Sequence, residues 1–279
     1  MWVGQQLADG LDFWGFLGSL ILGGIILGIY TGLLGYAGAK TGLSLDLLSQ
    51  RAFGEKGSYL PSAMTSFTQI GWFGVGSFVS GGTATPNFAR FAKNGKAGAI
   101  TTVVAFFIGN SLMFFFGAVS SIFVGGNDIF EVMVRLNLFY LAVLVLGLNI
   151  WTTNDNALYT AGLGLANIFH QRKKPMVLLS GIIGTVASVW LYYNFCGWLN
   201  ILNCTLPPVG MILVLAYFMN KEDFETDQPK LKTVDWFAVA GVILGAIVAN
   251  LLHWGIASIN GMVVAAVCYC VGQAVNKRK

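Results

Sequence analysis

Charged residues are scarce in this sequence, and that scarcity narrows the class of protein. Asp, Glu, Lys and Arg make up only 10% of the 279 residues, whereas hydrophobic residues make up 56% and the mean hydropathy is +0.70. A soluble domain carries about 25% charged residues, so a soluble enzyme or binding domain is excluded. The net charge of +4 is too small to indicate a nucleic-acid partner. We therefore expect an integral membrane protein surrounded by a lipid bilayer.

Histidine and cysteine are also scarce, which limits the chemistry available to the chain. His170 and His253 stand alone near the ends of apolar segments. The four cysteines lie in apolar stretches without the spacing of a metal site, so we expect free thiols. We find no Ser–His, paired-Asp or metal-ligand constellation at membrane depth. The sequence therefore favours a protein that is not an enzyme and has no bound cofactor.

Long apolar segments predict an all-α, polytopic helical membrane protein with a single transmembrane domain over residues 1–279. The expected spans are residues 14–39, 59–88, 97–123, 129–169, 176–195, 198–219, 236–254 and 256–274. The segment 129–169 is too long for one simple crossing, so we expect a bend or break within it. Pro207 and Pro208 should kink the span in which they lie.

Lysine and arginine in the short loops indicate the orientation of the chain. By the positive-inside rule, loops 40–56, 90–96, 170–174 and 220–235 should face the cytoplasm. The segment 59–88 would then begin and end on the same side. Its roughly 30 residues cannot cross twice, because each crossing needs about 20. We therefore expect this segment to be re-entrant or to be a fusion of two helices.

A cluster of polar residues interrupts the apolar stretch from Val143 to Ile168. At about 100° per residue, one helix face carries the following side chains: Asn149, Thr152, Thr153, Asn156 and Thr160. Asn154 and Asp155 point elsewhere. Hydroxyl and amide oxygens suit a hard cation such as Na⁺, and amides suit the polar edge of a small heterocycle. Hydrogen bonding between helices is the alternative use of such residues in a membrane bundle.

Several stretches together resemble the cytosine permeases of the nucleobase–cation symporter group, in the same order along nearly the whole chain. They are LGIYTGLLGYAGAKTGLS (27–44), TQIGWFGVG (68–76), AFFIGNSLMFFFGA (105–118), LGLNIWTTNDNALY (146–159), GIIGTVASVWLYYNFCGWL (181–199) and LPPVG (206–210). The resemblance implies the partial five-plus-five inverted-repeat fold of amino-acid/sodium symporter-like transporters, in the plasma (bacterial inner) membrane. It also implies import of cytosine or a related nucleobase, coupled to Na⁺ or protons, by alternating access around a midplane site.

The chain departs from the family pattern in two places. It begins in what resembles the middle of the first helix, so we expect the cytoplasmic half of that helix to be absent. After Gly76 it passes from a likeness to the third helix to a likeness to the second part of the sixth. We therefore expect the end of helix three, helices four and five and the start of helix six to be missing. The conflict with the positive-inside rule arises in the same part of the chain, the segment 59–88.

The resemblance also assigns roles to residues. Trp72 resembles the aromatic that stacks on the base, Phe78 its partner on the sixth helix, and Ser80 lies beside it. Asn149 and Asn154 match positions near substrate and ion. Thr152 and Thr153 match the hydroxyls of a sodium site, which Asn149 adjoins. The first-helix oxygens of that site would precede Met1, so we expect an incomplete site.

Two other functions also fit this sequence. The chain could be a transport-inactive remnant or minimal form of such a permease. Alternatively, it could be a structural or channel-like bundle in which the polar face only joins helices.

Overall fold

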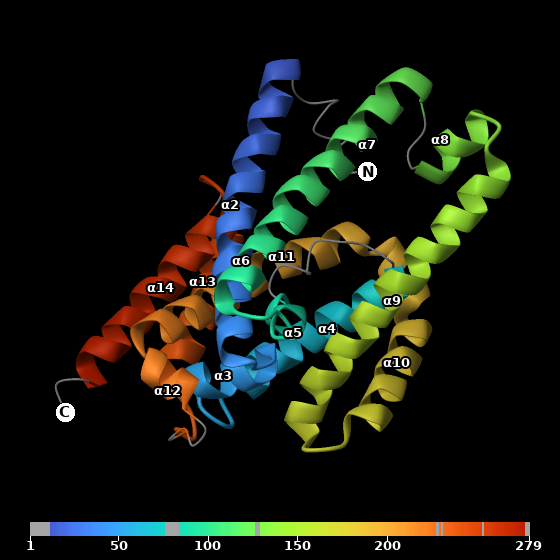
Figure 1. Ribbon diagram of the computed structural model, residues 1–279. Coiled ribbons are helices and arrows are strands. Elements are labelled where there is room, and N and C mark those ends of the chain that lie inside the picture. The colour runs from blue at the N-terminus through green and yellow to red at the C-terminus, as the bar shows by residue number, and fades with distance from the viewer. Residues whose placement is uncertain are drawn as a thin grey trace.

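The computed structural model describes residues 12–75, 84–125, 129–226, 229, 231–252 and 254–276. Every regular element among these residues is a helix (Figure 1). Within the described ranges, five helical stretches are long and apolar enough to cross a membrane: Phe13–Thr41, Gly95–Val124, Lys173–Leu191, Gly197–Met219 and Ala257–Asn276. The predicted all-α, polytopic membrane class is therefore confirmed.

The first group of helices is built around α2 (Phe13–Thr41), which packs along α6 (Gly95–Val103) and the π-helical segment Val104–Gly109 that continues it. Glycines on α2 permit this close approach. A Cβ at Gly35 would lie 2.5 Å from the Thr102 hydroxyl oxygen. Small residues at helix contacts are the usual means of close packing in membranes. After the π-helical segment, the chain continues as α7 (Asn110–Val124).

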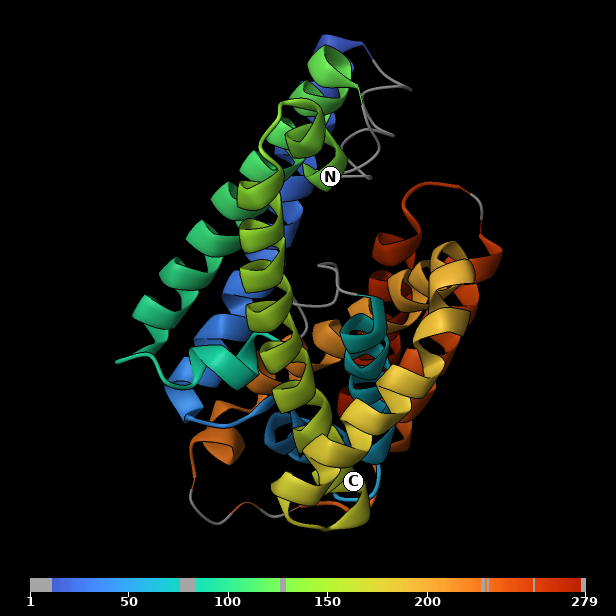
Figure 2. The ribbon, with the colours of Figure 1, turned by 90° about the vertical axis from the view of Figure 1, so that its right-hand side faces the viewer.

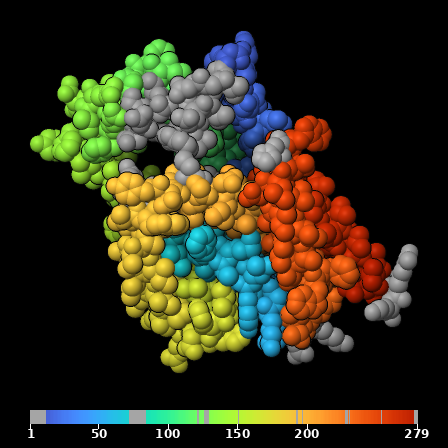
Figure 3. All heavy atoms as spheres, turned by 180° about the vertical axis from the view of Figure 1, so that it is seen from behind, coloured from blue at the N-terminus to red at the C-terminus, as the bar shows by residue number. Residues whose placement is uncertain are grey.

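The second group comprises α4 (Tyr59–Val75), α9 (Phe139–Phe169) and α10 (Lys173–Tyr193), which pack against one another. The Ser66 hydroxyl of α4 donates to the Ala161 carbonyl oxygen of α9 over 3.1 Å. In Figure 2 the lower half of α9 lies beside α4 and α10, whereas its upper half extends beyond them. From behind, α4 lies between α10 and α13 (Figure 3).

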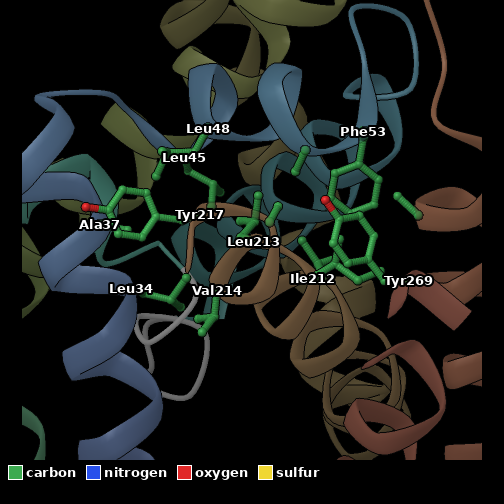
Figure 4. Packing of buried hydrophobic residues seen from close by; sticks show 14 of the residues in the cluster. Leu34, Ala37, Leu45, Leu48, Phe53, Ile212, Leu213, Val214, Tyr217 and Tyr269 are labelled. Atoms are coloured by element: carbon green, nitrogen blue, oxygen red, sulfur yellow. The ribbon is translucent and has the colours of Figure 1, made fainter. Parts of the chain in front are cut away.

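The third group consists of α11 (Phe195–Met219), α13 (Trp236–Leu251) and α14 (Ala257–Asn276). Pro207 and Pro208 lie inside α11, and the Pro208 ring fits between close-packed glycines of α13 and α14. A Cβ at Gly245 or at Gly261 would lie 3.2 Å from Pro208 Cγ. The main core joins this group to α2 and α3, with Tyr217 and Tyr269 almost fully buried in it (Figure 4).

The loop predicted at 40–56 contains a helix that the sequence reading missed, α3 (Leu45–Phe53). The Ser44 side chain caps its start by accepting from the Leu47 amide, as capping residues commonly do. Leu45 and Phe53 are fully buried. A second short helix, α12 (Lys221–Glu225), lies in the loop 220–235. Both helices lie with the α9–α10 turn at the lower end of Figure 1.

The predicted break in 129–169 falls at residues 136–138, between α8 (Ile129–Arg135) and α9. Asn137 there has a φ of 59°, which ends one helix and redirects the chain. The predicted re-entrant or fused segment 59–88 corresponds to α4 and to part of α5 (Pro86–Ala89). Its middle, residues 76–83, lies outside the described residues, so its path stays a prediction.

Candidate functional site

A cavity of about 660 Å³ lies between the middle of α9 and the α5–α6–α7 stretch, with one residue of α4 at its edge. Its volume falls within the roughly 300–1,000 Å³ typical of small-molecule sites. Polar side chains on several walls line it: Gln69, Thr85, Thr101, Thr102, Asn110, Asn149, Thr153, Asn156 and Thr160. The remaining lining residues are apolar or glycine. A mostly apolar cavity with a few amides and hydroxyls suits a small polar heterocycle.

The polar face predicted on α9 meets this cavity. Asn149, Thr153, Asn156 and Thr160 line it, whereas Asn154 and Asp155 do not. Spacing of three and four residues places the first group on one side of the helix. The helical reading of this stretch therefore located four of the five face residues correctly. The exception is Thr152, which the cavity does not include.

Hydrogen bonds within α9 occupy part of this polar face. The Thr153 hydroxyl donates to Asn149 Oδ1 over 3.2 Å. The Thr152 hydroxyl donates to the Leu148 carbonyl oxygen over 3.1 Å. Thr160 Oγ1 is buried and has no hydrogen-bond partner within the described part of the chain. A bound molecule with a polar edge would offer this hydroxyl a partner, which favours a site at this end of the cavity.

Asn154, a predicted substrate residue, lies on a different side of α9 from the cavity. It is half-buried, and its Oδ1 has no hydrogen-bond partner among the described residues. The geometry does not bring it together with Asn149, which lines the cavity. Its role in substrate binding thus stays a prediction that rests on the resemblance.

The wall opposite α9 contains residues that sequence reasoning did not single out. Phe106 lies in the π-helical segment and Asn110 begins α7. Thr102, Phe106 and Asn110 follow one another at intervals of four residues and all line the cavity. The stretch from α6 through the π-helical segment to α7 therefore forms one wall. Both missed residues lie in the motif AFFIGNSLMFFFGA, so the motif itself was the available signal.

Three predicted substrate residues lie at or beyond the end of α4. Trp72 belongs to the last turns of α4, and its side chain is not described. It follows Gln69 by three residues, so its backbone lies on the neighbouring part of the same helix face. Gln69 lines the cavity and was also missed by the sequence reading. Phe78 and Ser80 lie outside the described residues.

Comparison with known proteins adds to this geometry. The profile of a family described as "Permease for cytosine/purines, uracil, thiamine, allantoin" matches residues 1–84 and 74–275. The cytosine permease of Escherichia coli K12 is 36% identical over 372 aligned positions, covering 100% of this chain and 88% of that protein. The cytosine permease of E. coli O157:H7 matches to the same extent. The allantoin permease of Bacillus subtilis strain 168 is 35% identical over 82 residues, or 29% of this chain and 16% of the relative.

The membrane-length helices, together with these relatives, define a multi-pass membrane transport protein rather than an enzyme. The profile match and the full-length similarity make the assignment more specific. The chain belongs to the family of permeases for cytosine/purines, uracil, thiamine and allantoin. This confirms the resemblance drawn from the sequence motifs.

The alignment also confirms that the chain is shortened internally. It extends over 372 positions although the chain has 279 residues, so it contains gaps on the side of this chain. The two profile matches meet at residues 74–84. That is where the motifs predicted a junction, after Gly76.

Proposed function

We propose that this protein carries cytosine or a closely related nucleobase across the membrane by alternating access, with the cavity beside α9 as its substrate site. The observation that carries the proposal is the gathering of Asn149, Thr153 and Asn156 in one cavity, with Gln69 and Asn110 on other walls. Amide groups both donate and accept hydrogen bonds, as the edge of a nucleobase does. Family membership and the cytosine permeases among the relatives support the choice of substrate.

The base would be held by its edge and by its faces. Trp72 and Phe78 are proposed to stack on the two faces of the ring, with Ser80 beside Phe78, because flat aromatic rings bind a planar heterocycle without charge. Asn149 would bind the polar edge. Asn154 is kept as a proposed contributor that would have to be reached by a movement of α9.

Asn149, Thr152 and Thr153 are the residues proposed to hold sodium if sodium is a co-substrate, with protons as the other coupling ion to consider. The three residues lie within one turn and a half of α9, and their oxygens retain acceptor capacity. Three protein oxygens fall short of the shell that a hard cation prefers. We therefore propose that sodium coupling is weak or absent.

A second candidate function follows from the internal shortening. A chain that lacks part of the permease sequence could bind a nucleobase without carrying it. The same cavity residues would then serve a binding protein of the membrane.

Uptake of radiolabelled cytosine in cells that lack their own permease tests the main proposal. In parallel, cytosine should raise the thermal stability of the purified protein, by up to about 2.7 kcal/mol at 100 times the dissociation constant. Trp72→Ala should abolish that gain, whereas Trp236→Ala on the exposed side of α13 should keep it. Stabilisation without uptake favours the second candidate. Neither uptake nor stabilisation at millimolar cytosine would refute both.

A further inference from the structure

Asp46 is a buried acidic side chain that no part of the proposed transport site uses. It lies in the first turn of α3, the connecting helix between α2 and α4, and only 5% of its surface is exposed. Its Oδ1 accepts a hydrogen bond from the Ser62 hydroxyl of α4 over 2.6 Å. Buried carboxyl groups are rare unless they are paired or protonated. Its position therefore calls for a specific explanation.

A network of neutral side chains surrounds this carboxyl and joins three helices. Asn167 of α9 donates to Ser62 Oγ over 2.9 Å and to Ser58 Oγ over 3.1 Å. Gln50 of α3 donates to Asn167 Oδ1 over 2.6 Å. The backbone of Gly164 passes so close that an added Cβ would lie 3.5 Å from Asp46 Oδ1. Asp46 thus lies where α3, α4 and α9 meet.

The α5 region, which forms one wall of the cavity, is hydrogen-bonded to the start of α3, next to Asp46. The Leu45 amide donates to Asn87 Oδ1 of α5 over 2.8 Å. Arg90, just after α5, donates to the Tyr159 hydroxyl of α9. Phe88 of α5 lines the cavity and packs against the Tyr159 ring. These contacts hold α5 against α9 at the end of the cavity nearer α3 and close it there. We call this end the loop-side end of the cavity.

The charged groups near Asp46 can be named element by element. Arg90, beside α5, acts on it through its positive charge. α4 presents Ser62, and α9 presents Gly164 and Asn167, all neutral. Backbone groups of other neighbours contact more distant parts of α3: Arg51 of α3 donates to the Asp223 carbonyl oxygen of α12, and the Asp235 amide before α13 donates to the Phe53 carbonyl oxygen.

We propose that Asp46 is a proton-binding site, and that closure of the loop-side end of the cavity is tied to the uptake of one proton there. On closing, the carboxylate takes a proton from the cytoplasmic solution and forms an O–H bond. On opening, it returns that proton to the same solution. The proposal deepens the proposed function, because it assigns a regulation of the same cavity.

The direction in which pH changes closure follows from the burial of Asp46. Burial raises the pKa of Asp46 from 3.8 to about 6, although the hydrogen bond from Ser62 and the charge of Arg90 oppose the rise. If opening exposes Asp46 to water, its pKa returns to the lower value of 3.8. The closed arrangement therefore binds the proton more tightly than the open one. Acidification through pH 6 therefore favours closure, and a rise above pH 6 favours opening.

The test measures access to the closed end of the cavity in inside-out vesicles, without substrate. Ala157, which is buried and lines the cavity, is replaced by cysteine in a background without the native cysteines. Its reaction rate with an impermeant maleimide is divided by that of a Gln171→Cys variant in the exposed α9–α10 turn. This ratio removes the intrinsic pH dependence of the thiol reaction. We expect the ratio to rise several-fold between pH 5.5 and pH 7.5.

Three further variants separate protonation from a structural role. Asp46→Asn, which resembles the protonated form, should give a low ratio that does not change with pH. Ser62→Ala should shift the midpoint to higher pH, because the Ser62 hydrogen bond favours the ionised form. Glu222→Gln, on the exposed side of α12, should keep the response of the parent.

A pH-independent ratio in the parent would overturn the proposal, as would an unchanged pH response in Asp46→Asn. If Asp46→Asn fails to fold, an unchanged midpoint in Ser62→Ala overturns it equally. Because no nucleobase is present, the outcome is distinct from failure of cytosine binding.

Discussion

The two halves of α9 have different surroundings. From Ala157 onward, the helix is enclosed by α4 and α10, and Ala157, Thr160 and Ala161 are at most 2% exposed. Before that point it extends beyond α4, and Leu144 and Trp151 are more than half exposed. Exposed apolar side chains suit lipid, but Asn149 and Thr152 on the same half do not.

The two halves also differ in where their polar groups find hydrogen-bond partners: in other helices for the enclosed half, and in α9 itself, a ligand or water for the open half. The enclosed half has direct hydrogen bonds to other helices, at Ala161 and Asn167. On the open half, the hydroxyls of Thr152 and Thr153 bond within α9 itself. Substitutions in the enclosed half should therefore reduce stability, whereas those in the open half should reduce binding.

The largest expected difference in stability comes from a pair of glycines on α9. A Cβ at Gly164 would lie 2.1 Å from Ser66 Oγ and 2.8 Å from the Ser62 carbonyl oxygen, so Gly164→Ala should destabilise the protein by about 1–3 kcal/mol. A Cβ at Gly147 would meet no atom within 4 Å apart from its chain neighbours and the backbone of its own helix, and Gly147→Ala should stabilise the helix by about 0.5–1 kcal/mol. Thermal unfolding in detergent measures both. Equal effects would show that the two halves do not differ.

A smaller difference is expected from two asparagines on the same helix. Asn167→Ala removes the acceptor of the Gln50 amide and the donor to Ser58 Oγ and Ser62 Oγ, and should cost about 1–3 kcal/mol. Asn156→Ala removes an exposed side chain at the cavity and should change stability by less than about 0.5 kcal/mol. Unfolding curves of the two variants, run side by side, provide the check. A larger loss in Asn156→Ala would contradict the comparison.

The sequence predicted the polar face of α9 better than its surroundings, and the reason is physical. Helical spacing alone placed Asn149, Thr153 and Asn156 together, because side chains three and four residues apart share a face in any helix. Which helix faces them depends on long-range packing, so Gln69 and Asn110 were missed. The helix α3 was read as a loop because its charges masked the buried Leu45 and Phe53.

On the open half, Asn149 should contribute to binding without contributing to stability. Its side chain is exposed and bonds only to Thr153 among the described residues. Loss of one hydrogen bond to a nucleobase costs about 0.5–1.5 kcal/mol. Asn149→Ala should therefore weaken cytosine binding by up to about tenfold, with unchanged unfolding. Titration of the purified protein measures the affinity. The control is Gly147→Ala, two residues before Asn149 on an open surface of α9. It should bind cytosine as the parent does.

The smallest expected effect concerns Thr152 and Thr153. The Thr152 hydroxyl bonds to its own helix and lies outside the cavity, whereas Thr153 lines the cavity. Thr152→Ala and Thr153→Ala should each change stability by less than about 0.5 kcal/mol. If sodium coupling is weak, as we propose, uptake of cytosine should change little when a sodium gradient is imposed, in the parent and in both variants. Robust sodium-dependent uptake that is lost in Thr153→Ala but kept in Thr152→Ala would overturn this expectation. It would mean that Asn149 and Thr153 complete an ion site with oxygens that the described residues do not supply.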